Sequence, residues 1–227
     1  TDEINDLSYN LALKYDKRTF CEYYTSILKN KQLFYFAFCT FNDYNSGIIK
    51  KFIFLLSFAI HYTINALFFN DDNMHQIYED KGSYNISYQF PYILISTLIS
   101  IVIVRIMLEM LILTDKDILK VKHQNTKDLA ENMKLKVIKC LNIKFSIFFI
   151  LNFILLILFW FYLTCFNGIY GNTQIYLMKN TLISFSISLV LPFFWNIIPS
   201  LLRIISLNSK KFDREKLYSA SKICQLI

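Results

Sequence analysis

The sequence predicts an all-α membrane protein with four transmembrane helices and additional interfacial or cytoplasmic amphipathic helices. Apolar residues make up 55% of the 227 residues, and charged residues make up only 18%. Four nearly uncharged stretches reach the length of about 20 residues that a bilayer core requires. Lys and Arg are concentrated in alternate connecting segments, as in multi-span membrane proteins. The same composition, with 4 Gly and 3 Pro, excludes a disordered or collagen-like chain.

Each span is predicted from an apolar run between charged segments. The third run is dense in Phe, Ile and Leu and has no polar stripe at the helical period of about 3.6 residues. Only a membrane solvates such a surface. The four predicted spans are residues 50–69, 91–113, 145–166 and 181–203.

The connecting segments have distinct predicted roles. Residues 18–41 combine apolar residues at helical spacing with a run that is too short to span, so an interfacial helix is expected there. The middle loop is also expected to form an amphipathic helix. For both segments we favour a helix on the membrane surface, and a docking site for a cytoplasmic partner is the alternative. The segments are a cytoplasmic juxtamembrane segment (1–49), an outer loop (70–90), a basic cytoplasmic helical loop (114–144), a second outer loop (167–180) and a cytoplasmic tail (204–227).

The distribution of Lys and Arg predicts the orientation. Of the 24 basic residues, 21 lie in residues 1–51, in the middle loop or in the tail counted from Arg203, whereas the outer loops hold only Lys81 and Lys179. We therefore expect both termini to be cytoplasmic. The net charge of +7 then indicates attraction to anionic lipids. No aromatic and basic recognition motif accompanies it, so nucleic acid is not an expected partner.

One sequon agrees with this orientation. Asn85, followed by Ile86 and Ser87, is the only N-x-[ST] site, and it lies in the first predicted outer loop. Asn85 is therefore a glycosylation candidate. It favours the plasma membrane or the secretory pathway, while the mitochondrial inner membrane stays open as an alternative.

Arg105 and Glu109 are the most informative charged pair. They are spaced i, i+4 inside the second predicted span, so they can form an ion pair on one helical face. Ionisable residues within spans are costly and often functional. A gate or ion pathway is one interpretation, and a structural pair that sets the rotation or depth of the helix is the interpretation we favour.

Polar residues also mark the first span. Ser57, His61 and Asn65 form one stripe at four-residue spacing. Such a stripe can relay protons or bind an ion, but polar residues also join helices by hydrogen bonds, and we favour this packing role.

Pro192 and Pro199 share a face of the fourth span and predict a helix kink. A broken helix that lines a transport site is the alternative to this structural role. Cys140, just cytoplasmic of the third span, is a palmitoylation candidate.

No sequence motif predicts catalysis. The chain has no G-x-S-x-G, H-E-x-x-H or phosphate-binding glycine loop, and its five Cys form no CxxC pair. We expect no catalytic residues, no metal site and no cofactor, and hence not an enzyme.

Several sequence strings resemble an uncharacterised multi-span C-terminal region of large transmembrane surface proteins of ciliate-like single-celled eukaryotes. The strings are LALKYDKRTF (11–20), NDYNS (42–46), NALFF (65–69), MHQIYE (74–79) and YGNTQIY (170–176). The resemblance covers nearly the whole chain. It implies a recurring membrane module behind a long extracellular part, and it makes a start at Thr1 sensible as part of a larger protein.

Two functions follow as hypotheses. The first is a non-enzymatic multi-pass membrane anchor and assembly module, forming the C-terminal part of a larger surface protein. The alternative is a channel or transporter subunit that acts as an oligomer. The expected partners are the lipid bilayer, with anionic lipids on the cytoplasmic side, and either further copies of the chain or other membrane or extracellular subunits.

Overall fold

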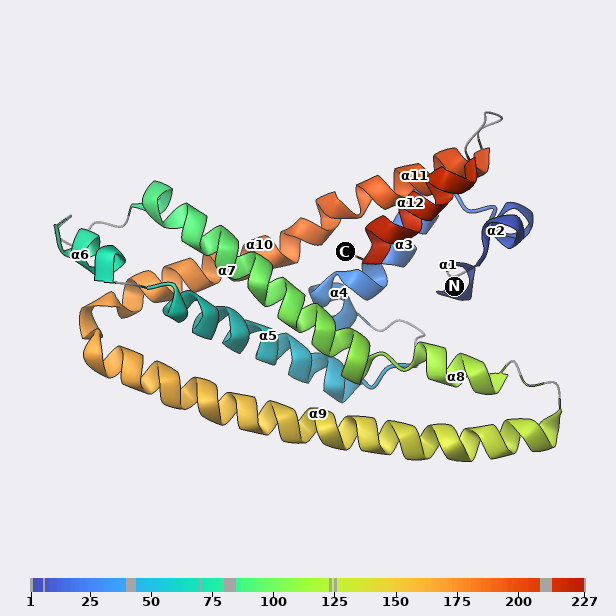
Figure 1. The fold of residues 1–227 in the computed structure, drawn as a ribbon, viewed down its shortest axis with the longest axis horizontal. Helices are drawn as coiled ribbons and strands as arrows, with labels where there is room; N and C mark the ends of the chain where they lie inside the picture. Colours follow the sequence, from blue (N-terminus) through green and yellow to red (C-terminus); the bar gives the residue numbers. More distant parts are fainter. Residues whose placement is uncertain are drawn as a thin grey trace. The chain divides into compact units, whose positions relative to one another are not determined.

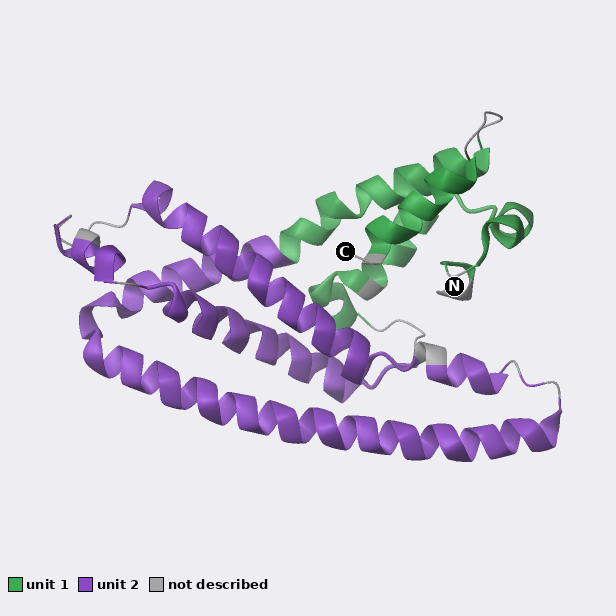
Figure 2. Ribbon diagram, in the orientation of Figure 1, with its two compact units in different colours: residues 1–39, 189–227 green, residues 40–188 purple. Residues whose placement is uncertain are grey.

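In the computed structural model, 90% of the described residues are helical and none of them forms a strand. Those residues are 2–5, 7–39, 44–69, 71–79, 85–122, 124, 126–208 and 214–226. They form two compact units (Figure 2). Unit 1 comprises residues 1–39 and 189–227, and unit 2 comprises residues 40–188.

Unit 1 is built from short helices of both chain ends. They are α1 (Asp2–Asn5), α2 (Tyr9–Tyr15), α3 (Phe20–Lys31), α4 (Leu33–Phe38), the last turns of α10 (Gln174–Trp195), α11 (Ile197–Asn208) and α12 (Arg214–Leu226). Thr19 and Glu22 form a capping box at the start of α3, which satisfies two backbone N–H groups that the helix leaves free. Helix α11 packs against α12 and α3 (Figure 1).

Unit 2 contains the longest helices. They are α5 (Gly47–Leu67), α6 (Asp71–Glu79), α7 (Ile86–Met107), the π-helical segment η1 (Leu108–Ile112), α8 (Asp115–Lys122), α9 (Lys127–Ile169), the 3-10 turn η2 (Gly171–Thr173) and most of α10. Helix α5 packs against α7 and α9, and α8 packs against α9 (Figure 1).

Four helices are long and apolar enough to cross a membrane. They are Gly47–Leu67, Ile86–Lys122, Lys127–Ile169 and Gly171–Asn208, and each contains most of one predicted span. In α9 the predicted third span and the predicted middle-loop helix form one helix of 43 residues. No Gly or Pro lies between residues 127 and 167, so nothing in this stretch breaks the helix.

The exposed surface of α9 is unusually apolar. Large side chains point outward on several sides of the helix, and Trp160 is 77% exposed. A surface of this kind in water would be a liability for aggregation, whereas lipid chains solvate it. The exposure pattern is therefore compatible with a membrane protein.

Hydrogen bonds join three segments at one end of unit 2. Thr114, which follows η1, donates its N–H to Asn45 Oδ1 at 2.9 Å and its hydroxyl to the Tyr44 carbonyl at 2.9 Å. Lys144 of α9 donates to the Leu113 carbonyl at 2.6 Å. The segments that precede α5, follow η1 and enter the apolar part of α9 thus lie at the same end of the unit.

A small apolar core closes the opposite end. Phe69 follows α5 and packs edge to face on Phe166 of α9, with ring centres 6.1 Å apart. Ala66 and Leu177 complete this core. Connections between helices therefore alternate between two ends, as the run of predicted spans requires.

The break between α10 and α11 lies between the two prolines. Helix α10 includes Pro192 and ends at Trp195, and Pro199 has no N–H to offer the Trp195 carbonyl four residues earlier. At the break, the Pro192 carbonyl accepts both the side-chain amide of Asn196 at 2.7 Å and its backbone N–H at 3.1 Å.

Candidate functional site

Arg203 of α11 is the largest fully buried side chain among the described residues, with 0% exposure. Its guanidinium pairs with the Asp16 carboxylate, at 2.8 Å from Nη2 to Oδ2. It also donates to the backbone carbonyls of Ile4 at 2.7 Å and Asn5 at 3.0 Å. A buried charge is tolerated when it is paired and hydrogen-bonded in this manner.

Two tyrosine rings enclose the same guanidinium. The ring centres of Tyr23 and Tyr218 lie 4.7 Å and 4.8 Å from Arg203 Cζ, which is cation–π distance. The Tyr218 hydroxyl donates to the Leu7 carbonyl at 2.7 Å, and the Gln225 amide donates to the Tyr23 hydroxyl. Burial raises the pKa of Tyr23 to about 12, although the nearby arginine charges act in the opposite direction.

Arg18 completes this group, which we call the arginine cluster (Asp16, Arg18, Tyr23, Arg203 and Tyr218). The Arg18 Nε lies 2.8 Å from Asp16 Oδ1, so one carboxylate serves two guanidinium groups. Burial alone would raise the pKa of Asp16, but the hydrogen bonds and charges of the two arginines outweigh it and hold this pKa below its ordinary value of 3.8. The contacts of the cluster join the N-terminal segment, α3, α11 and α12. They hold these elements of unit 1 together.

Only part of this cluster is indicated by the amino-acid sequence. Ser200, Arg203 and Ser206 are all fully buried and form a polar stripe at three-residue spacing on α11. The stripe can be read from the sequence, in which Arg203 also marks the predicted end of the fourth span. Nothing local identifies Asp16 as its partner, because 187 residues separate the two.

A second polar network joins the candidate spans of unit 2. The Ser96 hydroxyl of α7 donates to Asn65 Oδ1 of α5 at 2.8 Å. A hydrogen bond of 2.8 Å joins the hydroxyls of Thr97 in α7 and Ser184 in α10. The Asn180 amide donates to Gln89 Oε1 at 3.1 Å, again between α10 and α7. All six residues are buried, so these bonds connect the helices in their interior.

His61 lies one turn from Asn65, and both residues belong to the polar stripe of the first predicted span. Its Nδ1 donates to the Ser57 carbonyl at 2.8 Å, and its ring packs on Phe185 at 5.4 Å between centres. The side chain is 1% exposed, and its Nε2 has no hydrogen-bond partner.

Ser100 is also buried without a partner for its hydroxyl. Helices α5 and α7 run antiparallel (Figure 1), and Asn65 pairs with Ser96. The residues one turn further on, His61 and Ser100, therefore lie at the same level of the helix pair. The sequence stripe on α5 pointed to His61 but gave no indication of Ser100.

Arg105 and Glu109 form the ion pair that their spacing allows, with 2.8 Å between Nε and Oε1. The Arg105 side chain is 24% exposed and that of Glu109 is 46% exposed. The pair lies at the junction of α7 and η1, at the end of unit 2 where Thr114 is bonded. The ion pair shares no residue with the hydrogen bond between Asn65 and Ser96.

The two modification candidates are both exposed. Asn85 caps α7, because its Oδ1 accepts the backbone N–H groups of Ser87 at 3.1 Å and Tyr88 at 3.4 Å. Cys140 lies on the exposed surface of α9 as a free thiol.

Comparison of the chain with protein-family models, with curated proteins and with solved structures finds no match. Within the described part of the chain, no three His, Cys, Asp or Glu side chains gather as metal ligands would.

Proposed function

We propose that the chain is a non-enzymatic multi-pass membrane anchor and assembly module. The observation that carries this proposal is the set of three hydrogen bonds that join α7 to α5 and α10. In a bilayer, polar side chains that bond to one another across helices hold those helices together. Six buried amide and hydroxyl side chains of these spans are used in this way.

The orientation is part of the same proposal. Lys50 and Lys51 at the start of α5 and the basic segment after η1 lie at one end of unit 2, and positive segments favour the cytoplasmic side. Both termini are then cytoplasmic, and Asn85 faces the outer side of the plasma membrane or of a secretory compartment.

Helix α9 gives the module a cytoplasmic extension. Its 43 residues span about 65 Å at a rise of 1.5 Å per residue, whereas a bilayer core is about 30 Å thick. The part before residue 145 carries Lys residues together with exposed Leu135 and Ile143. Such a surface fits anionic lipid headgroups or another subunit, in agreement with the resemblance to the end of larger surface proteins.

Reconstitution of the purified chain tests this function. We expect the chain to stay in the membrane fraction after carbonate extraction and to give no ion or proton flux in sealed vesicles. Release by carbonate would contradict the anchor, and flux through the wild-type chain would contradict its non-transport role.

The alternative function is a channel or transporter subunit that acts as an oligomer. His61 and Ser100 favour it, because polar groups without partners inside spans are expensive and often functional. His61→Ala would then abolish flux, whereas His75→Ala would not. His75 is the matched control, since it is exposed on α6 and pairs with Glu79 at 3.0 Å.

A further inference from the structure

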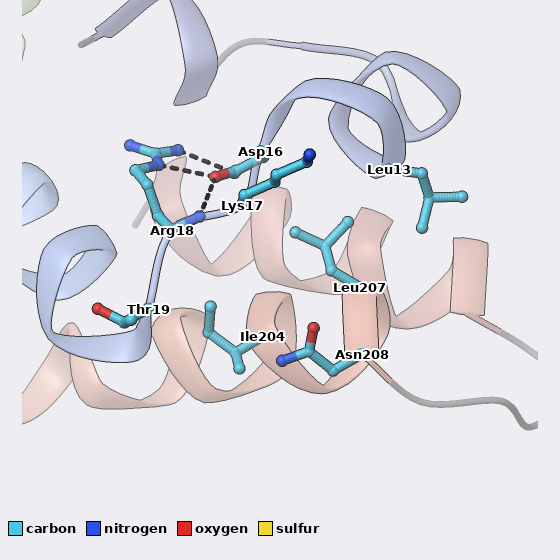
Figure 3. Close-up of a pocket in the computed structure, with 8 residues that line it drawn as sticks. All are labelled: Leu13, Asp16, Lys17, Arg18, Thr19, Ile204, Leu207 and Asn208. Atoms are coloured by element: carbon cyan, nitrogen blue, oxygen red, sulfur yellow. Dashed lines mark hydrogen bonds and ion pairs between the residues drawn. The ribbon is translucent and has the colours of Figure 1, made fainter.

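Unit 1 contains a cavity beside the arginine cluster. It lies between the segment that links α2 to α3 and the last turns of α11, and its volume is about 350 Å³. This volume lies in the usual range for small-ligand sites. Figure 3 shows the residues that line it, which are Leu13, Asp16, Lys17, Arg18, Thr19, Ile204, Leu207 and Asn208.

The charge at the cavity favours an anion. Asp16 is the acidic residue of the lining, and its carboxylate is already held by Arg18 and by Arg203 behind it. Lys17 is exposed and forms no ion pair or hydrogen bond within the described part of the chain. Glu22, one turn into α3, is held by the backbone N–H of Thr19 at 2.8 Å. The positive charge of Lys17 is therefore the one that a ligand can use.

The opposite wall includes two apolar side chains. Ile204 and Leu207 face the cavity from α11, and Asn208 adds an amide at its edge (Figure 3). Helix α11 is also the last part of the candidate span Gly171–Asn208. The cavity thus combines a cation with apolar side chains, at the end of a helix that can leave a membrane.

We propose that this cavity binds the phosphate-bearing headgroup of an anionic phospholipid. Lys17 contacts the phosphate, Asn208 donates to it, and Ile204 and Leu207 contact the glycerol and the first acyl carbons. A lipid is favoured over a soluble phosphate because its glycerol and acyl carbons can be buried against Ile204 and Leu207, whereas a free anion has no apolar part to bury. This inference rests on the proposed membrane function.

Thermal unfolding of the full chain in uncharged detergent tests the proposal. The ligands are dioctanoyl phosphatidic acid, dioctanoyl phosphatidylcholine and inorganic phosphate, because a ligand that binds the folded state raises the unfolding temperature. We expect saturable stabilisation by phosphatidic acid only. Lys17→Gln should weaken this affinity about tenfold, the usual value of a charge-assisted hydrogen bond.

Lys14→Gln is the matched control. Lys14 lies three residues earlier, and its ammonium contacts the Tyr15 ring at 5.3 Å instead of lining the cavity. Equal weakening by the two variants would overturn the site, since it would indicate general surface attraction. Equal stabilisation by inorganic phosphate would overturn the lipid as the ligand. Absence of stabilisation by phosphatidic acid would contradict the lipid site. Carbonate extraction tests the membrane anchor separately, so the two failures can be distinguished.

Discussion

The carboxylate of Asp16 lies 2.8 Å from the buried guanidinium of Arg203, at the other end of the chain. This ion pair, with the two tyrosine rings around it, holds the N-terminal segment against α11 and α12. One buried charge therefore connects the two chain ends within unit 1. The stability of this unit is expected to be sensitive to single substitutions at the ion pair.

Asp16→Asn should destabilise unit 1 strongly. The substitution leaves Arg203 buried without a counter-charge, and such a change costs about 3–5 kcal/mol. Denaturant unfolding in detergent measures this loss. Asp128→Asn is the control, because Asp128 is exposed at the start of α9. Similar losses in the two variants would indicate that the ion pair has no special role.

Unit 1 should also lose stability at high pH. The pKa of Tyr23 is raised by burial from 10.0 to about 12 in the folded chain. The folded state thus retains the phenolic proton more firmly than the unfolded state does. Its contribution is complete below pH 10 and is lost between pH 10 and pH 12, for a total of about 3 kcal/mol.

Tyr23→Phe isolates this effect. The variant keeps the ring over Arg203 but has no proton to lose. The difference in unfolding free energy between wild type and variant should therefore change across this pH range. A constant difference would show that Tyr23 ionisation is not coupled to folding.

Asn65 and Ser96 should be energetically coupled. A double-mutant cycle with Asn65→Ala and Ser96→Ala should give about 0.6 kcal/mol and at most about 1.7 kcal/mol, as for other bonds between spanning helices. The same cycle with Ser100→Ala in place of Ser96→Ala is the control, because the Ser100 hydroxyl has no partner. Equal coupling in the two cycles would argue against a specific joint.

Substitutions can separate the helix cap that Asn85 forms from its proposed glycosylation. Asn85→Asp keeps the side-chain acceptor that caps α7, and Ser87→Ala keeps the capped N–H. Both changes remove the sequon, so both should abolish a glycan-dependent mobility shift in microsomes without loss of stability. Asn85→Ala should in addition cost about 1 kcal/mol. A glycan that persists on the Ser87→Ala variant would refute modification at this sequon.

The four long apolar helices could be predicted because an uncharged run of about 20 residues matches the thickness of a bilayer core. The bounds of α9 were harder to predict. Residues 114–144 have the polarity of a loop, but they contain no Gly or Pro that would mark where a helix begins or ends. The stripe of His61 and Asn65 indicated buried polar contacts. It did not identify Ser96, because helical spacing says which face is polar and not which helix meets it.

In the proposed topology, α9 crosses a membrane with its basic start on one side and η2 on the other. Single-cysteine chains retaining only Cys140, or carrying Asn172→Cys, test it most directly in sealed vesicles with a membrane-impermeant maleimide. Both positions are exposed and lie on either side of residues 145–166. We expect reagent outside the vesicles to label one variant and reagent inside to label the other. Labelling of both from the same side would contradict the claim.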